Sequence, residues 1–175
     1  MIVTHSFTSR LRRLLKHRWL DEDDTHKAIP PELLERLKRR VAASENRHSG
    51  EIRLCIEASL PSSYVWRDAM PRERAVAMFG KLRMWDTEHN NGVLIYLLLA
   101  ERAIEIIADR GLSNRVPSAQ WTSMVQRMGN AFREGRFEDG LTQALEEVSA
   151  LLVQHFPLEP GEGNRNELPD EPVLG

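Results

Sequence analysis

The hydrophobic residues of this chain are densest in one stretch near its middle. Eight apolar residues run without interruption from Val93 to Ala100, between the turn-forming Asn90-Asn91-Gly92 and the charged pair Glu101-Arg102. A run of this length bounded by turn residues is typical of a strand buried on both faces. A second, isoleucine-rich run begins at Ala103, and the tight turn between the runs predicts two antiparallel strands.

Alternation of apolar and polar residues predicts another strand earlier in the chain. Between residues 51 and 58, apolar side chains alternate with Arg53, Cys55 and Glu57, which is typical of a strand with one strongly apolar face.

Apolar residues at helical spacing predict the helices that cover these strands. The predicted helices span 9–20, from Pro30-Pro31 to before Gly50, from Pro71 to about residue 85, from Val116-Pro117-Ser118 to Gly135, and 137–156. A helix between two strands favours parallel pairing of those strands. We therefore expect a single α/β domain, with a mixed sheet of about three to five strands covered by helices.

Composition divides the chain into three parts. Residues 1–28 form a basic amphipathic segment followed by an acidic linker, and residues 29–156 hold the α/β domain. Residues 157–175 contain four prolines and five acidic residues against one arginine, so we expect a disordered acidic tail.

Overall charge and residue usage exclude several classes of protein. The 24 Lys and Arg against 26 Asp and Glu give a net charge of -2, so no general field attracts nucleic acid. The single cysteine, Cys55, excludes an internal disulfide and a cysteine-rich zinc site, and its thiol is either reactive or passively buried. The longest apolar run of eight residues is too short for a transmembrane helix, which needs about 20. We expect a cytoplasmic protein, free or peripheral to a membrane.

The amino-terminal segment allows two interpretations. Residues 9–20 place leucines on one side of a helix and basic residues on the rest, which suits docking on an anionic membrane or on a partner helix. The same helix could instead pack on its own domain. The acidic run from Asp21 to Asp24 lies within about one Debye length of the basic residues and opposes attraction to anionic lipid.

Several motifs resemble those of the TPM domain family, whose name joins a thylakoid lumen protein, a photosystem repair factor and a nematode receptor modulator. The resemblance covers roughly residues 30 to 156. It is carried by residues 50–56, by Asn90-Asn91-Gly92-Val93-Leu94, by residues 104–106, by Gly111-Leu112, and by the Phe-x-x-Gly-x-Phe-x-x-Gly segment of residues 132–140.

Membership of that family implies functions of two kinds. Some members are associated with calcium binding and weak acid phosphatase activity, and others with repair or assembly of membrane complexes. This chain departs from many members at residues 108–115, where they have a glycine-rich segment followed by an acidic residue. The resemblance by itself therefore does not assign a metal-binding or phosphatase role to residues 108–115.

Polar residues gather where the second predicted strand begins and the third ends. They are Asp86, Glu88, Asn90, Asn91 and Asp109. Their oxygen atoms suit Ca²⁺ or Mg²⁺, which makes them our candidate metal ligands. In the alternative interpretation, Asn90-Asn91-Gly92 serves only as a turn and Asp109 is held in a salt bridge.

No complete catalytic motif is present. The six histidines never come within four residues of one another, which excludes a helical two-histidine metal site, and His89 in the turn is either a ligand or simply exposed. The sequence favours a non-catalytic or regulatory domain acting through a protein partner, in the maintenance or assembly of membrane-associated complexes. The alternative is a divalent-metal-dependent, phosphatase-like enzyme built on the five polar residues.

Overall fold

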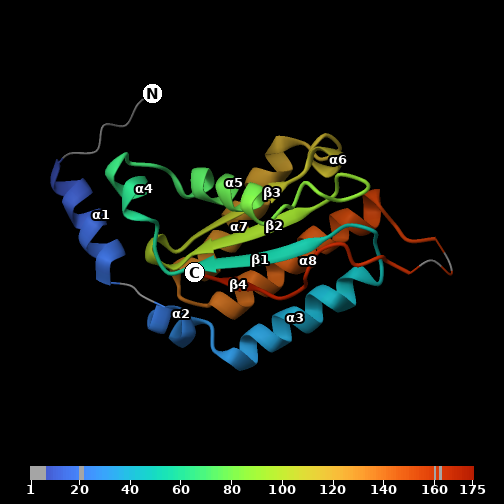
Figure 1. Cartoon of the computed structure of the whole chain (residues 1–175), viewed down its shortest axis with the longest axis horizontal. Helices are drawn as coiled ribbons and strands as arrows, with labels where there is room; N and C mark the ends of the chain where they lie inside the picture. Colours follow the sequence, from blue (N-terminus) through green and yellow to red (C-terminus); the bar gives the residue numbers. More distant parts are fainter. Residues whose placement is uncertain (1–6, 20–21, 160, 162) are drawn as a thin grey trace.

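A four-stranded mixed sheet runs through the centre of the molecule (Figure 1), in the order β3-β2-β1-β4. The computed structural model describes residues 7–19, 22–159, 161 and 163–175 of the chain. The strands are β1 (Ile52–Glu57), β2 (Val93–Leu98), β3 (Ala103–Ala108) and β4 (Val173–Leu174). The predicted α/β class and mixed sheet are confirmed.

The two central strands pair as their sequence pattern predicts. β1 and β2 are parallel, with Ile52 opposite Val93 and Glu57 opposite Leu98. β2 and β3 are antiparallel and are joined through the short 3-10 helix η1 (Leu99–Glu101). Arg102 closes this turn in the left-handed region, with φ of 50°. Each residue of β2 is buried, as expected for an uninterrupted apolar strand.

Eight helices are present in the described part of the chain. They are α1 (Phe7–Trp19), α2 (Glu22–Ala28), α3 (Pro31–Glu45), α4 (Ser62–Trp66), α5 (Pro71–Lys81), α6 (Arg110–Ser113), α7 (Ser118–Arg133) and α8 (Phe137–His155). Prolines stand at the first positions of α3 and α5, where a missing N–H costs nothing.

The helices cover both faces of the sheet and create two apolar clusters. One cluster joins the face that carries Ile52, Leu54 and Ile56 to α3, α7 and α8. The other joins the opposite face, which carries Cys55 and Tyr96, to α4 and α5. Successive side chains of β1 therefore pack into two separate apolar clusters, one on each side of the sheet.

Helix α1 and the last residues of the tail, 173–175, both lie against the domain. Residues 1–6 and 20–21 of the predicted amino-terminal segment lie outside the described residues, as do residues 160 and 162 of the tail. The sequence predicts a disordered tail, whereas the structure places Val173–Leu174 beside β1 as a parallel strand. Acidic and proline-rich composition predicts little apolar burial, but main-chain hydrogen bonds to a strand edge do not depend on composition.

Candidate functional site

The five predicted metal ligands lie around the loop that leads into β2, but their side chains have different surroundings. Asp86 and Glu88 are exposed, and a carboxylate oxygen of Asp86 lies 3.3 Å from Nη2 of Arg83. Asn91 is fully buried and donates weakly to Ser49 Oγ at 3.4 Å. This loop therefore directs part of the predicted set outward and part into the domain.

Asn90 and Asp109 are connected through the residue that follows Asp109. Asp109 caps the short helix α6, where its Oδ1 accepts the Arg110 N–H at 2.7 Å. The Arg110 side chain donates to Asn90 Oδ1 at 3.1 Å. Two oxygen atoms at this edge, Asn91 Oδ1 and Asp109 Oδ2, are buried without a hydrogen-bond partner among the described residues.

Close main-chain packing gives the glycines of this loop a structural role. A Cβ on Gly92 would lie 2.1 Å from the Met84 carbonyl oxygen. A Cβ on Gly111 would lie 2.4 Å from the carbonyl oxygens of both His89 and Asn90. Asn90 itself has φ of 51°, a conformation that asparagine tolerates. Turn geometry and close packing therefore account for Asn90 and Gly92 of the Asn-Asn-Gly sequence.

Within the described ranges, no group of three or more His, Cys, Asp or Glu side chains is arranged to hold a metal ion. Cys55 is fully buried, and this burial raises the pKa of its thiol to about 12. Such a thiol stays protonated, which agrees with the passive interpretation of this residue.

The opposite ends of β1 and β2 are capped by α1. Arg13 donates to Glu101 Oε1 at 2.7 Å, to Asp68 Oδ1 at 2.8 Å and to the Ala69 carbonyl. Ligands of open α/β sheets bind at the carboxyl ends of parallel strands, and this is the end that α1 occupies.

A buried histidine provides the second anchor of α1. His17 Nε2 lies 2.9 Å from Glu101 Oε1, and its Nδ1 accepts the Leu60 N–H at 3.0 Å. Burial favours the neutral form of Glu101, but hydrogen bonds from His17 and Arg13 outweigh it and lower the pKa of this carboxyl. The amino-terminal helix is thus packed on its own domain through a charged anchor.

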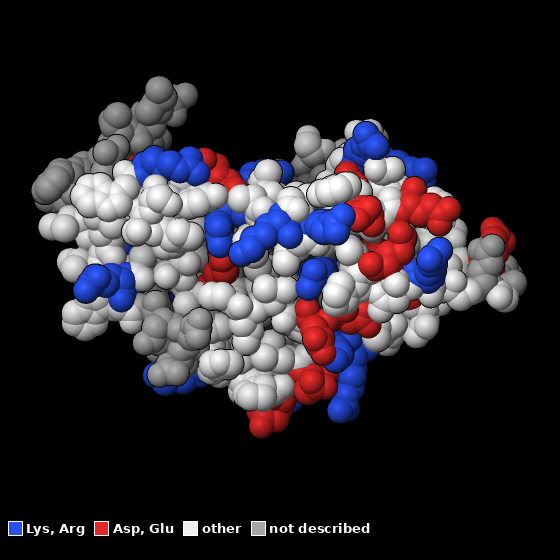
Figure 2. All heavy atoms as spheres, viewed as in Figure 1, with Lys and Arg blue, Asp and Glu red and all other residues white. Residues whose placement is uncertain are grey.

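The exposed side of α1 carries large apolar side chains beside basic ones, and α4 adds a further apolar side chain. We name as the α1–α4 surface four large exposed side chains: Leu11 (49% exposed), Leu15 (51%), Trp19 (81%) and Trp66 (71%). A cavity of about 590 Å³ lies between the two helices and the loop at Leu60. Figure 2 shows this end of the molecule, at left, as a largely uncharged area with basic side chains at its margins.

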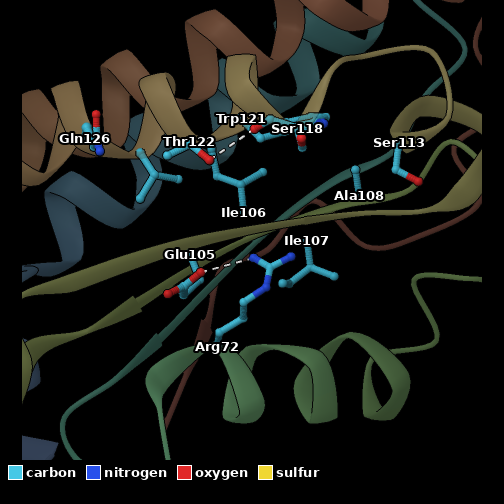
Figure 3. Close-up of a pocket in the computed structure, with 11 residues that line it drawn as sticks. Arg72, Glu105, Ile106, Ile107, Ala108, Ser113, Ser118, Trp121, Thr122 and Gln126 are labelled. Carbon is cyan, nitrogen blue, oxygen red and sulfur yellow. Dashed lines mark hydrogen bonds and ion pairs between the residues drawn. The ribbon is translucent and has the colours of Figure 1, made fainter. Parts of the chain in front are cut away.

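A second cavity of about 400 Å³ lies along the outer edge of β3 (Figure 3). Arg72 reaches it from α5, and its Nη1 lies 3.2 Å from Glu105 Oε2. Trp121 and Thr122 line the other side from α7. Because this wall comes from elements far apart in the sequence, local patterns do not predict it.

Sequence reasoning placed candidate chemistry at the loop before β2 and missed the anchors of α1. A helix carrying both leucine and arginine signals two faces, but the partners of Arg13 and His17 lie more than 40 residues away. No spacing rule connects residues at that separation. No helix among the described residues combines the length and the apolar character that crossing a bilayer requires.

Comparisons with known proteins give a consistent family and fold. The model of the TPM domain matches residues 23–151. The solution structure of the BA42 protein from the psychrophilic bacterium Bizionia argentinensis is 26% identical with a TM-score of 0.72, and the match covers 84% of this chain and 95% of that one. The N-terminal domain of a protein from P. gingivalis shares the fold at 19% identity and a TM-score of 0.59, over 74% of this chain and 81% of that one. No curated protein matches.

Proposed function

The chain belongs to the TPM domain family, and from that premise we propose that it is a non-catalytic or regulatory domain that acts through protein interaction. Its partner is part of a membrane-associated complex, which the domain helps to maintain or assemble. The observation that carries this proposal is the α1–α4 surface.

The composition of the α1–α4 surface is that of an interface. Leu11, Leu15 and Trp66 line one cavity. Trp19 follows Leu15 one helical turn later on α1, and each of the four side chains is about half exposed or more. Burying apolar area is worth roughly 25 cal/mol per Å², and tryptophan is enriched among the residues that dominate binding energy. Large exposed apolar side chains grouped on neighbouring helices support an interaction site here.

The charges beside this surface indicate the chemistry of the partner. Arg12, Lys16 and Arg18 are exposed on α1, whereas Arg13 is already paired with Glu101 and Asp68. A partner segment with an apolar face and acidic residues at its rim would complement both features. We therefore propose an amphipathic, acidic helix of the partner as the occupant.

The test is photo-crosslinking from single positions in the cells that produce the protein. A benzophenone side chain at Trp66 or at Leu15 should give the same defined adduct, identified by mass spectrometry. The matched control is Val76, which is 52% exposed on α5 but lies outside the α1–α4 surface. Leu11→Glu should abolish the Trp66 adduct, since it places a charge in the apolar contact.

Two outcomes would contradict the proposal. Equal adducts from Val76 would mean that contacts are unspecific. Absence of adducts, together with flotation of the chain on phosphatidylglycerol vesicles that Leu11→Glu prevents, would assign the α1–α4 surface to a lipid surface instead.

The second candidate function is divalent-metal-dependent, phosphatase-like activity at the loop before β2. It is favoured by the two buried oxygens without partners, Asn91 Oδ1 and Asp109 Oδ2. Calcium or magnesium at 100 times its dissociation constant should then stabilise the fold by about 2.7 kcal/mol, and Asp109→Asn should reduce that gain. Unchanged thermal melting with either ion, and no hydrolysis of p-nitrophenyl phosphate, would exclude this candidate.

A further inference from the structure

β3 is the full-length strand at one edge of the sheet, and it pairs with β2 alone in the described chain. At the other edge, the two-residue β4 pairs with Cys55 and Ile56 of β1. In an antiparallel pair, alternate residues direct their N–H and C=O groups away from the partner strand. The hydrogen bond from Asp109 N to Gly92 O sets this alternation. The outward groups are therefore those of Ile104, Ile106 and Ala108.

Two of these three residues lie along the 400 Å³ cavity between α5 and α7, which we name the β3 groove (Figure 3). Ile106 and Ala108 line it from the strand, Arg72 from α5, and Trp121 and Val125 from α7. Its volume falls in the range of ordinary ligand pockets, about 300 to 1,000 Å³. The groove thus combines a free strand edge with side walls.

One donor in the wall of the β3 groove lacks an acceptor. The indole Nε1 of Trp121 is buried and has no hydrogen-bond partner within the described part of the chain. A buried donor left unpaired is unfavourable, because it has lost its hydrogen bond to water and gained none in the protein. A main-chain carbonyl entering the groove would supply the missing acceptor.

The two walls differ in polarity, and this difference selects a side-chain pattern. The α7 side presents Trp121 and Val125, whereas the α5 side presents the Arg72–Glu105 ion pair. Successive side chains of a strand point to opposite faces of the sheet. A strand added to β3 would therefore turn every second side chain toward an apolar wall and the others toward a charged one.

We propose that the β3 groove binds an extended segment of a partner protein as an additional strand, with apolar side chains facing α7 and polar side chains facing α5. Addition of a strand to a sheet edge is a general mode of peptide recognition. The same sheet accepts a short strand at its other edge, where β4 pairs through Val173 and Leu174. This proposal is independent of the α1–α4 surface.

The test begins with a random library of peptides of about ten residues, displayed on phage and selected on the full chain. The selected sequences should share apolar residues at alternate positions. The best peptide, made synthetically, is then the probe in a fluorescence anisotropy titration. Two methylated versions of the peptide are compared, one with methyl groups on the odd-numbered main-chain nitrogens and one with them on the even-numbered nitrogens. One version should lose binding and the other should bind as before, because only one set of N–H groups faces β3.

Hydrogen exchange measured by NMR locates the probe on the chain. The amides of Ile104, Ile106 and Ala108 should gain protection when the probe binds, while those of Glu105 and Ile107, which already face β2, should change little. This alternation is specific to an added strand, since a peptide bound only by side chains would not produce it.

Matched variants complete the test. Val125→Lys should weaken binding of the probe by about tenfold or more, because it places a charge in the apolar wall. Val153→Lys, a half-buried valine on α8 outside the groove, should bind as the parent does. Trp121→Phe keeps the ring but lacks the N–H, and should weaken binding about threefold or more. Thermal melting of each variant separates lost binding from lost folding.

Four results would overturn the proposal. The selection could return no alternating peptide. The probe could bind without alternate protection in β3, or with equal affinity to Val125→Lys. Finally, the free chain could self-associate with Ile104, Ile106 and Ala108 protected, which would identify a second copy as the occupant. Leu11→Glu should leave binding of the probe unchanged, so failure here is distinguishable from failure at the α1–α4 surface.

Discussion

The two edges of the sheet are built in opposite ways. At the β1 edge, β4 pairs with β1, the Gly175 N–H donates to the Ile56 carbonyl, and the Ala58 N–H donates to the Gly175 carbonyl. The other edge, β3, has no added strand in the described residues. The tail therefore extends the sheet beside Cys55 and Ile56 of β1, whereas β3 is the edge at which we propose that a partner binds.

Two buried glutamates lie near the β1–β4 edge, which we call the closed edge; the β3 edge is the open edge. Glu57 is 6% exposed and is held by Arg74 at 2.5 Å and by the Tyr96 hydroxyl at 2.7 Å. Glu51 is fully buried and accepts the N–H groups of Glu167 and Leu168, both at 3.2 Å. Main-chain donors of the tail and one arginine of α5 thus offset the cost of burying these two carboxyl groups.

Helix α5 contributes one arginine to each edge, which makes the comparison testable within a single helix. Arg74 is largely buried against Glu57, whereas the Arg72 side chain is 62% exposed and its partner Glu105 only partly so. The same residue type, two positions apart, thus serves a buried ion pair and a solvent-screened one.

The largest effect should come from the buried pair. Arg74→Met leaves Glu57 buried without a cation, and removal of one partner from a buried ion pair costs about 3 to 5 kcal/mol. Arg72→Met should cost about 1 kcal/mol or less, since exposed pairs contribute little. Urea denaturation gives both free energies of unfolding.

A double variant checks the cause of that loss. Adding Glu57→Gln to Arg74→Met removes the buried charge, so part of the lost stability should return. Equal losses from Arg72→Met and Arg74→Met would show that the two edges do not differ in this respect.

The next effect concerns the attachment of the tail. Leu168 is buried at 9% exposure in the apolar cluster on the α5 side of the sheet, and Leu168→Ala should cost about 2 kcal/mol by loss of that burial. The Ala58 amide, which donates to Gly175, should exchange faster in this variant. Leu174→Ala, in the half-buried β4, is the milder control. Unchanged exchange at Ala58 would show that β4 stays paired without the Leu168 anchor.

Local patterns sufficed for the strands but not for the closed edge. The uninterrupted apolar run from Val93 predicts β2, and the alternation of 51–58 predicts β1. Burial on both faces of a strand requires consecutive apolar residues, and burial on one face requires every second residue to be apolar. The tail shows neither pattern. Its pairing depends on the free edge of β1, more than 100 residues away, and on Glu51 accepting two main-chain N–H groups.

The candidate site shows the same division. Turn chemistry around Asn90 is readable locally, and Gly92 and Gly111 are required by close main-chain packing. The contacts of α1 with Glu101 cannot be predicted from local patterns. Arg13 precedes Glu101 by 88 positions in the sequence, and His17 precedes it by 84. The prediction that residues 9–20 are amphipathic therefore identified the exposed leucines but not the buried side of the helix.

The third effect is a pH dependence at the closed edge. Burial raises the pKa of Glu45 to about 8, from an ordinary value of 4.5, and its Oε1 accepts the Ile52 N–H at 3.0 Å. Because the folded-state pKa is the higher one, the folded protein binds the extra proton. The stability contributed by the neutral acid is complete below about pH 4.5 and is lost as the pH rises through about 8. Glu51, whose pKa burial also raises, acts in the same direction.

Replacing Glu45 by glutamine should remove most of that dependence. Between pH 6.5 and 8 the parent should lose about 1 to 2 kcal/mol of unfolding free energy more than Glu45→Gln, at up to 1.36 kcal/mol per pH unit for one proton. Buried His48, with its pKa lowered by burial to about 4, destabilises the fold only below about 6.5, so this window isolates the carboxyls. Parallel pH profiles for the parent and the variant would contradict the assignment to Glu45.

The smallest effect on stability should come from the open edge, where the change is expected in association instead. Glu105 is the charged residue of β3, and burial raises the pKa of its carboxyl group. Glu105→Val removes this charge and should reduce the free energy of unfolding by about 0.5 kcal/mol or less, since its ion pair with Arg72 is solvent-screened. A charged residue on an edge strand discourages pairing between copies of a chain. Glu105→Val should therefore sediment at higher mass than the parent at equal concentration, while Glu105→Gln, neutral but polar, should shift less. Identical sedimentation of the parent and both variants would contradict this role of the charge. It would mean that the side walls of the β3 groove prevent another copy of the chain from pairing with β3.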